Sequence, residues 1–458
     1  MNNRVLPSAI KSVKQTIDAI NLQWGGFPNC TTEGTYCYFT QGIQLNKVSP
    51  RDIDVLKHAQ LGQLTTIQAQ KKITTVAEHE YTHWVDMNCS IYGLRTLINL
   101  AKSYDSNPNI NLRASEHNFF YAKLAADSIR QIRLPSYYSV TEKVDIRGSW
   151  TYDLTMGHGF DATGRSNGDP IIFLRFFDGD KMFFTRQPLS LSSILEGNAT
   201  YQEILATLNA NLSIEEEGER IVESKIDEQR LMENLYDKNL TLYSVAAHLI
   251  ASQLKAPNVV TAYRAVGIIA KFVMNCPKSL LSKFEATQIF VRIFGASVAT
   301  RIENSIRRGN VESLFFYAVK MMDIQSERLE YVEVINFMLA ERCFGITLKE
   351  LQSAIDSEVD QLCGAIWDTK FPDARKIACA AAYNNKYITT FSNAAYKFDD
   401  LHLPPCFLEN DDVYIYSGKS DNPLRSLPIA DRFWTLADNE QWIRTFSEAC
   451  YPRHEIYD

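Results

Sequence analysis

The chain has 458 residues, of which 45% are hydrophobic, and its formal net charge is −7. This length predicts two to four domains with sizeable apolar cores, and the negative charge argues against a general nucleic-acid-binding protein. Nine cysteines are scattered without a Cys-x-x-Cys pair, which favours reduced thiols in the cytoplasm. The first residues, Met1–Pro7, lack the hydrophobic stretch of a secretory signal, in agreement with that location.

A helix is predicted over about residues 73–97, where apolar residues recur at helical spacing and no proline occurs. It contains the run His79-Glu80-Tyr81-Thr82-His83. Two histidines four residues apart lie on one helical face, so both imidazoles can bind the same zinc ion. Glu80 would stand beside that ion, in a position to accept a proton from a metal-activated water.

The segment that follows predicts a helix over 112–132, then extended segments over 137–144 and 148–156. Two runs rich in β-branched and aromatic residues flank Asp178-Gly179-Asp180, which predicts a hairpin over about residues 170–186. Such a hairpin either offers an edge to which an extended peptide can add or only covers the core.

A second acidic motif begins at Glu196, on a helix predicted over about residues 188–210 that starts near Pro188. A catalytic zinc site needs three protein ligands, so a third must be found besides His79 and His83, and Glu196 is a candidate. Two other residues stay open as third ligands: His158, in a glycine-rich segment, and Asp86, one turn beyond His83. Asp86 and Cys89 stand where a metzincin would have glycine and histidine, which excludes that subclass.

From residue 213 to about residue 398 the sequence is helix-patterned, with helices of roughly 15–20 residues that predict a helical array or bundle. Its most apolar segment, 259–276, carries Arg264 and Lys271, so we expect a buried helix and no membrane span. A local basic cluster, Arg301, Arg307 and Arg308, is typical of a solvated helix face. Residues 399–458, with several prolines and aromatic residues, predict an irregular extension.

Two runs of the sequence resemble a known group of enzymes. The runs Val76–Asp86 and Glu196–Glu203 are similar to the active-site helix and the third-ligand helix of gluzincin-type zinc metallopeptidases, in the thermolysin and peptidase MA clan. The second of these helices typically reads Glu-Gly-Phe-Ala-Thr-Tyr-x-Glu in the aminopeptidase branch. The resemblance covers only two helices, and 112 residues lie between His83 and Glu196, which is far more than gluzincins usually have.

The resemblance implies that His79, His83 and Glu196 bind Zn²⁺ and that Glu80 is the general base. It also implies an α+β, mostly α fold: a zincin-like domain over residues 1–212 with a small antiparallel β element, followed by the large helical domain over 213–398. The second donor that would stabilise an oxyanion is open among Tyr201, His158 and His248.

The predicted function is therefore zinc-dependent hydrolysis of peptide bonds in a peptide or protein substrate, with no nucleic acid or membrane as partner. Two alternatives stay open. One is a non-hydrolytic scaffold in which zinc staples two helices and the C-terminal helices bind a partner, although such a scaffold has no need of Glu80 as a base. The other is a latent peptidase of a regulatory or host-defence system, regulated through the C-terminal helices.

Overall fold

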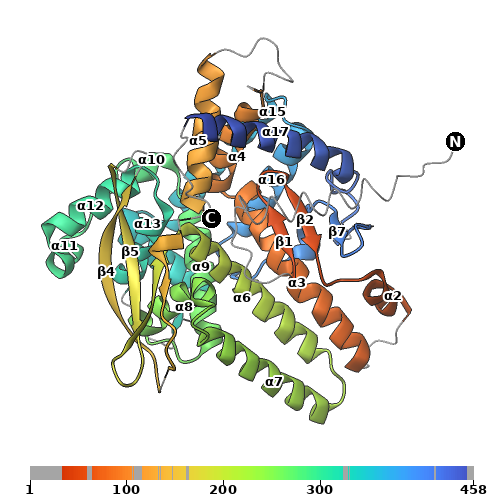
Figure 1. Ribbon diagram of the computed structural model, residues 1–458, viewed down its shortest axis with the longest axis horizontal. Helices are drawn as coiled ribbons and strands as arrows, with labels where there is room; N and C mark the ends of the chain where they lie inside the picture. Colours follow the sequence, from red (N-terminus) through yellow and green to blue (C-terminus); the bar gives the residue numbers. More distant parts are fainter. Residues whose placement is uncertain are drawn as a thin grey trace.

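The computed structural model describes residues 33–450 apart from 59–63, 106, 108–115, 133, 135, 147, 161–164, 323–327, 330 and 417–418. The expectation for the segment Met1–Pro7 lies outside this part of the chain. The described residues are mostly helical and form two four-stranded sheets (Figure 1). The predicted α+β, mostly α class is confirmed at this level. None of the described helices is both long and apolar enough to cross a lipid bilayer.

The first sheet joins the two ends of the described chain. It has the order β1-β2-β7-β8, from β1 (Thr35–Cys37), β2 (Gly42–Leu45), β7 (Cys406–Leu408) and β8 (Val413–Tyr414). β2 and β7 are parallel, while the outer pairs are antiparallel. The sequence did not predict this mixed sheet. Its strands are short, and the parallel pair brings together residues more than 360 positions apart, such as Gln44 and Phe407.

The predicted helix over 73–97 is wrong in its bounds, because the structure divides that segment. After α2 (Pro50–His58) come α3 (Leu64–Cys89) and α4 (Ile91–Asp105), and α3 begins nine residues before the predicted start. Ser90 separates α3 from α4: its hydroxyl donates to the carbonyl of Asp86 and accepts from the N–H of Gly93 at 3.0 Å. A serine that caps the next helix in this way ends the previous one.

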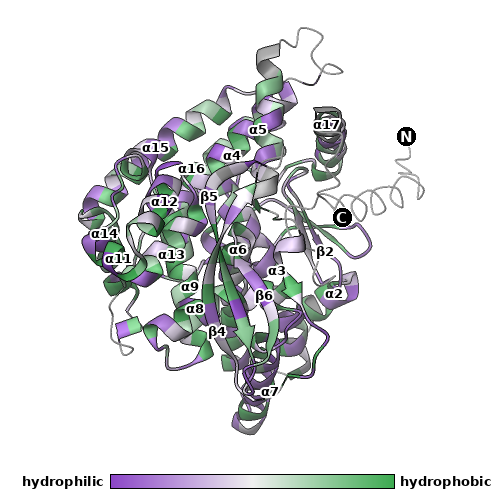
Figure 2. Cartoon of the chain, turned by 60° about the vertical axis from the view of Figure 1, so that its left-hand side comes forward, coloured by the Kyte–Doolittle hydropathy of each residue, from purple (hydrophilic) through white to green (hydrophobic). Residues whose placement is uncertain are grey.

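The second sheet contains the predicted hairpin. α5 (Glu116–Ile132) and a 3-10 turn (Ser136–Tyr138) precede β3 (Val140–Thr141), β4 (Thr151–Phe160), β5 (Ser166–Phe177) and β6 (Phe183–Leu189). The order is β3-β6-β5-β4, and every pair is antiparallel. The hairpin is confirmed as β5 and β6, and the start of the helix predicted over 112–132 lies outside the described residues. Figure 2 shows this sheet in front of α8 and α9.

The third-ligand helix is α6 (Leu191–Leu212), and its predicted start near Pro188 is wrong. Pro188 belongs to β6, where it lies opposite Phe173. The helix starts at a capping box instead: the side chain of Ser190 accepts from the N–H of Ser193, whose hydroxyl in turn accepts from the N–H of Ser190. The strand therefore continues up to the residue before the cap.

Most of the later chain is helical, as predicted for 213–398. The helices are α7 (Glu217–Leu235), α8 (Thr241–Leu254), α9 (Val259–Met274), α10 (Lys278–Leu281), α11 (Gln288–Phe294), α12 (Ala296–Arg307), α13 (Val311–Met321), α14 (Val332–Phe344), α15 (Leu348–Trp367) and α16 (Ala374–Ile388). Residues 278–294 form two short helices rather than one of the predicted length of roughly 15–20 residues, because Thr287 caps α11 with its side chain. The tip of α7 is strongly hydrophilic in Figure 2.

The prediction that the C-terminal extension is irregular is wrong for part of the segment. It includes α17 (Ile429–Cys450) besides β7, β8 and a 3-10 turn (Phe398–Asp400). α17 packs mainly against α5. Its buried face includes Phe433, Leu436 and Ile443, and the buried carboxylate of Glu440 interrupts that apolar stripe.

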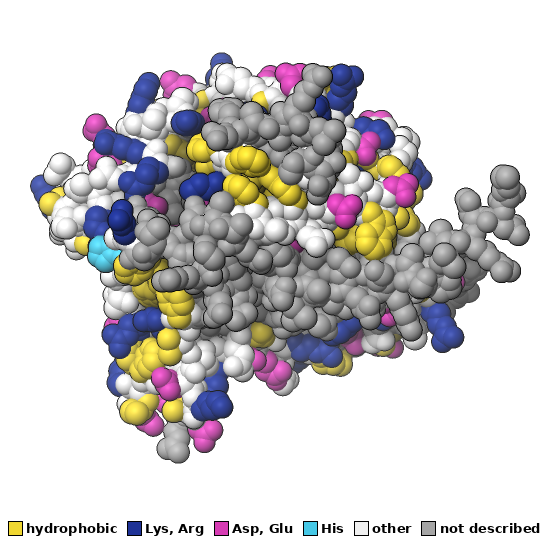
Figure 3. Space-filling view, turned by 45° about the horizontal axis from the view of Figure 1, so that its top comes forward, with side chains coloured by type: hydrophobic (Ala, Val, Ile, Leu, Met, Phe, Trp, Pro, Cys, Tyr) yellow, Lys and Arg dark blue, Asp and Glu magenta, His cyan; other side chains and the backbone are white. Residues whose placement is uncertain are grey.

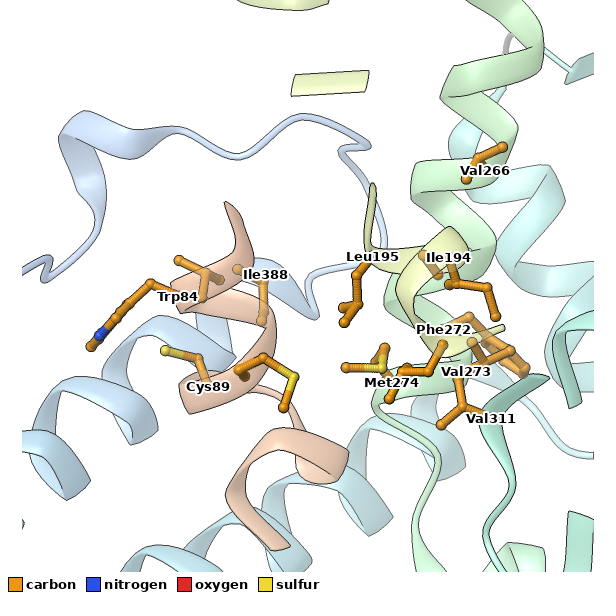
Figure 4. Packing of buried hydrophobic residues seen from close by; sticks show 14 of the residues in the cluster. Trp84, Cys89, Ile194, Leu195, Val266, Phe272, Val273, Met274, Val311 and Ile388 are labelled. Atoms are coloured by element: carbon orange, nitrogen blue, oxygen red, sulfur yellow. The ribbon is translucent and has the colours of Figure 1, made fainter. Parts of the chain in front are cut away.

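One hydrophobic cluster extends from Tyr36 to Ile443 and includes side chains from all three predicted regions. Figure 4 shows Leu195 of α6 in this cluster, between side chains of α3 such as Trp84 and side chains of α9 such as Met274. The core therefore surrounds α6 and fixes its position against α3 and α9. The seven cysteines whose side chains the structure describes are free thiols.

Charged side chains of both signs are spread over the face in Figure 3, with Lys and Arg gathered toward its left-hand edge. α11 and α12 lie on that side of the molecule in Figure 1. On α12, Arg307 pairs with Glu303, and Arg308 pairs with Asp169 of β5. Arg301 donates to the carbonyl oxygen of Gly157 at 2.8 Å. The basic cluster seen in the sequence is thus engaged in contacts within the chain.

Candidate metal centre

Two neighbouring helices bring His79, His83 and Glu196 together. His79 and His83 lie one turn apart on α3, and Glu196 lies in the second turn of α6, which packs along α3. Oε2 of Glu196 is 3.2 Å from Nε2 of His79 and 3.4 Å from Nε2 of His83. In the part of the chain that the structure describes, no other group of three such side chains converges in this way.

The chemistry and spacing of these donors fit a divalent metal ion. Four donors bound to one zinc ion at about 2.0–2.1 Å in a tetrahedron are about 3.3 Å apart. The two distances from Glu196 match that separation, and the three ligand atoms all lie within 4.8 Å of one another. Two imidazoles and one carboxylate leave a fourth tetrahedral position open, as catalytic zinc sites require.

Glu203 is an outer partner of the cluster. Its Oε2 is 3.2 Å from Nδ1 of His79, the ring nitrogen that faces away from Glu196. A carboxylate at this atom fixes the tautomer and the orientation of a ligating histidine. Glu203 ends the run that resembles the third-ligand helix, but no role was predicted for it. The available signal was its distance of seven residues from Glu196, which is two helical turns on the same face of α6.

The charges of the cluster shift one another's pKa values. Burial alone would raise the pKa of Glu196, but His83 and His79 outweigh it and hold this pKa at about 2. Burial alone would lower the pKa of His79, whereas Glu196 and Glu203 raise it well above its usual value. For His83, burial is the larger effect and lowers the pKa. A cation that binds here must therefore displace a proton from His79.

Glu80 lies in the same pocket, between the helix and strand β1. Its side chain is buried, and burial raises its pKa to about 8 even though the charge of His79 acts in the opposite direction. The N–H of Tyr36 donates a hydrogen bond to its carboxylate. At Gly34 a Cβ atom would lie only 2.6 Å from Cγ of Glu80, so glycine lets the strand approach this side chain. Tyr36 of β1 and Gly34, the residue before that strand, thus hold Glu80 in place.

The cluster opens into a pocket of about 1280 Å³. Its walls come from β1, α3, α6, α7, α8 and the first turns of α9. Tyr243 and Tyr263 contribute to the wall, and the Tyr243 ring centroid is 6.3 Å from that of His79. These two tyrosines were not singled out in the sequence, because α8 and α9 reach the site only through tertiary packing.

The three residues predicted as oxyanion donors lie elsewhere. Tyr201, His158 and His248 are not among the side chains that line the pocket. His248 is half-buried against Trp150 and Phe176 near the second sheet. No residue of the β5–β6 hairpin lines the pocket either. The strand that does line it is β1, which lies at the edge of the first sheet in the described part of the chain.

The rival third ligands are also outside the cluster. Asp86 is buried, and its carboxylate accepts hydrogen bonds from Tyr396 at 2.6 Å and from Asn198 at 2.9 Å. His158 was expected in a glycine-rich loop, but it lies on β4, exposed and 3.4 Å from Arg301. Of the three residues weighed as third ligand, the structure brings only Glu196 to His79 and His83.

No known protein family, curated protein or solved structure matches this chain. Its function must be argued from the geometry of the site.

Proposed function

We propose that this chain is a zinc-dependent metallopeptidase of the gluzincin type. One observation carries the proposal: the ligand atoms of His79, His83 and Glu196 converge within 4.8 Å in the wall of a large pocket that also contains Glu80. A structural zinc site is usually closed by four protein ligands, whereas this one has three and faces an open space. The neighbouring carboxylate supplies the base that hydrolysis needs.

A zinc ion at His79, His83 and Glu196 would supply a Lewis acid for the scissile carbonyl and an activated water. The charge of that ion would lower the raised pKa of Glu80, so that its carboxylate could accept a proton from the attacking water and deliver it to the leaving amine. The N–H of Tyr36 and the close approach of Gly34 hold the Glu80 side chain in the wall of the same pocket as the three ligands.

The walls of the pocket suit an extended peptide. β1 is an edge strand within the described sheet and lines the pocket, so a substrate can pair with it as an additional strand. The hydroxyl group of Tyr243, whose ring centroid is 6.3 Å from that of His79, is a pocket candidate for a hydrogen bond to the developing oxyanion. The hydroxyl of Tyr263 donates instead to the backbone carbonyl of Tyr243.

The test is Glu80→Gln, which keeps the shape of the side chain and removes the base. We expect the variant to retain zinc and its melting temperature while its rate on an unfolded reporter protein falls by at least about 100-fold. Glu228→Gln removes a carboxylate from the same pocket without touching the cluster and serves as the matched control. Undiminished hydrolysis by Glu80→Gln contradicts the proposal.

The scaffold alternative gives a different result in the same experiment. A zinc staple between α3 and α6 would raise the melting temperature of the wild-type chain when zinc is added, with no cleavage of the reporter. In that case Glu80→Gln would change neither zinc binding nor any measurable rate.

A further inference from the structure

Arg264 is a cation in the wall of the pocket that has no acidic partner among the described residues. It lies on α9, next to Tyr263, and is half-buried. Its Nε atom is enclosed and has no hydrogen-bond partner among the described residues. No carboxylate in the described part of the chain lies within ion-pair distance of its guanidinium group. A guanidinium whose Nε is enclosed without such a contact is unfavourable unless an anion satisfies the group.

The other cations of the pocket differ from Arg264 in this respect. Each has an acidic neighbour: Lys71 pairs with Asp227 and Glu223, Lys72 with Asp52, and Arg230 with Asp227. Their charges are compensated within the protein. Arg264 is therefore the pocket cation that is available to a bound molecule.

The start of α9, the helix that carries Arg264, also favours a negative group. The N-cap of α9 is Asn258, and Val259 and Val260 in its first turn line the same pocket. The positive end of the helix dipole thus acts in the same direction as the guanidinium. A guanidinium presents a planar fork of N–H donors, which matches a carboxylate in two parallel hydrogen bonds.

We propose that Arg264 binds a carboxylate of the peptide substrate and thereby selects acidic peptides. This inference deepens the proposed function, because it assumes a peptide in the pocket. Two parts of a peptide offer the same chemistry: the side chain of Asp or Glu, and the C-terminal carboxylate. The first would make the enzyme specific for acidic sequences, and the second would direct it to the ends of chains.

The test measures binding without cleavage, in full-length protein that carries Glu80→Gln. Three labelled peptides of equal length are compared by fluorescence anisotropy at low salt. One has a glutamine at its centre and an amidated C-terminus, one has glutamate in place of that glutamine, and one has the glutamine and a free C-terminal carboxylate. We expect at least one acidic peptide to bind about 10-fold more tightly than the neutral one, and added salt to weaken that preference.

Substitutions of Arg264 identify the group responsible. Arg264→Gln should abolish the preference, whereas Arg264→Lys should keep part of it, since the charge remains but the planar fork is lost. Lys72→Gln removes a pocket charge that is already paired with Asp52 and should leave the preference unchanged. The melting temperature of each variant reports whether the fold is retained.

The inference is overturned if the Glu80→Gln protein binds all three peptides equally or binds none of them. It is also overturned if the preference for an acidic peptide survives Arg264→Gln. If Arg264→Gln fails to fold, the peptide comparison in the parent protein and in Arg264→Lys still decides the question. Hydrolysis by the wild-type chain is measured separately, so uniform cleavage of acidic and neutral peptides refutes the role of Arg264 and leaves the proposed function intact.

Discussion

Removal of the Glu203 carboxylate should weaken metal binding although Glu203 is not itself a ligand. The contact to be broken is the 3.2 Å pair between Oε2 of Glu203 and Nδ1 of His79. In Glu203→Ala, the ring of His79 loses the group that fixes its tautomer and orients Nε2 toward Glu196. Glu203→Gln keeps an oxygen acceptor and removes only the charge, which separates the two contributions.

The structure sets the expected magnitude. Outer partners of metal-ligating histidines typically contribute about 10–100-fold to metal affinity. The side chain of Glu203 is 46% exposed, so solvent screens its charge and the lower end of that range applies. We expect about a 10-fold loss of zinc affinity in Glu203→Ala, which is about 1.4 kcal/mol, and a smaller loss in Glu203→Gln.

The loss should also depend on pH. Glu203 raises the pKa of His79, so in the wild-type chain a proton competes more strongly for this histidine. Removal of Glu203 lowers that pKa and relieves the competition, which partly offsets the weaker binding at low pH. The difference in zinc affinity between the wild type and Glu203→Ala should therefore be larger at about pH 8 than at about pH 6.

The assay is competition with a chromophoric zinc chelator at both pH values. Glu196→Ala, which removes a proposed ligand, should lose more affinity than either variant of Glu203. Glu228→Gln removes a negative charge from the same pocket without contact to His79 and should bind as the wild type does. Unchanged affinity in Glu203→Ala at both pH values, or an equal loss in Glu228→Gln, would refute the reasoning.

Two further predictions concern stability. Burial lowers the pKa of His248 to about 4, so the unfolded chain binds more protons below pH 6.5, and this residue contributes stability that is lost as the pH falls from 6.5 toward 4. Urea unfolding of His248→Phe should show about 2 kcal/mol less pH dependence of stability between pH 6.5 and 4.5 than unfolding of the wild type, and the same pH dependence in both proteins would contradict the assignment. At Gly197 a Cβ atom would lie 2.8 Å from Cγ1 of Val266, so Gly197→Ala should destabilise the protein by about 1–2 kcal/mol. Val266→Ala should relieve that clash, and a double-mutant cycle with additive effects would show that the two helices are not in tight contact there.

The sequence was sufficient to predict the part of the site that lies on a single helix. The spacing of His79 and His83 follows from 3.6 residues per turn, and any helix over that segment places both imidazoles on one face. The bounds of the helices were less predictable, because they depend on caps. Ser90 divides α3 from α4, and the capping box at Ser190 and Ser193 starts α6, although both are short polar signals inside segments of helical periodicity.

The remainder of the site could not be predicted, because it depends on which helices pack together. Tyr243, Tyr263 and Arg264 lie on α8 and α9, and nothing in their local sequence distinguishes them from other polar residues of a helical array. β1 approaches Glu80 only because its sheet includes β7, from near the C-terminal end of the described chain. Contacts of this kind are set by the whole fold.

The long segment between the two halves of the site is compatible with a precise site, because direct contacts fix the register of α3 against α6. Asp86 lies one turn beyond His83, and Asn198 lies two residues beyond Glu196. The amide of Asn198 donates to the carboxylate of Asp86 at 2.9 Å, in a buried environment where a displaced partner would leave a polar group unsatisfied. This pair therefore resists sliding of the two helices by even one residue. Since the entropy of loop closure grows only slowly with length, a β-sheet of this size can be inserted between α3 and α6 without changing the positions of His79, His83 and Glu196.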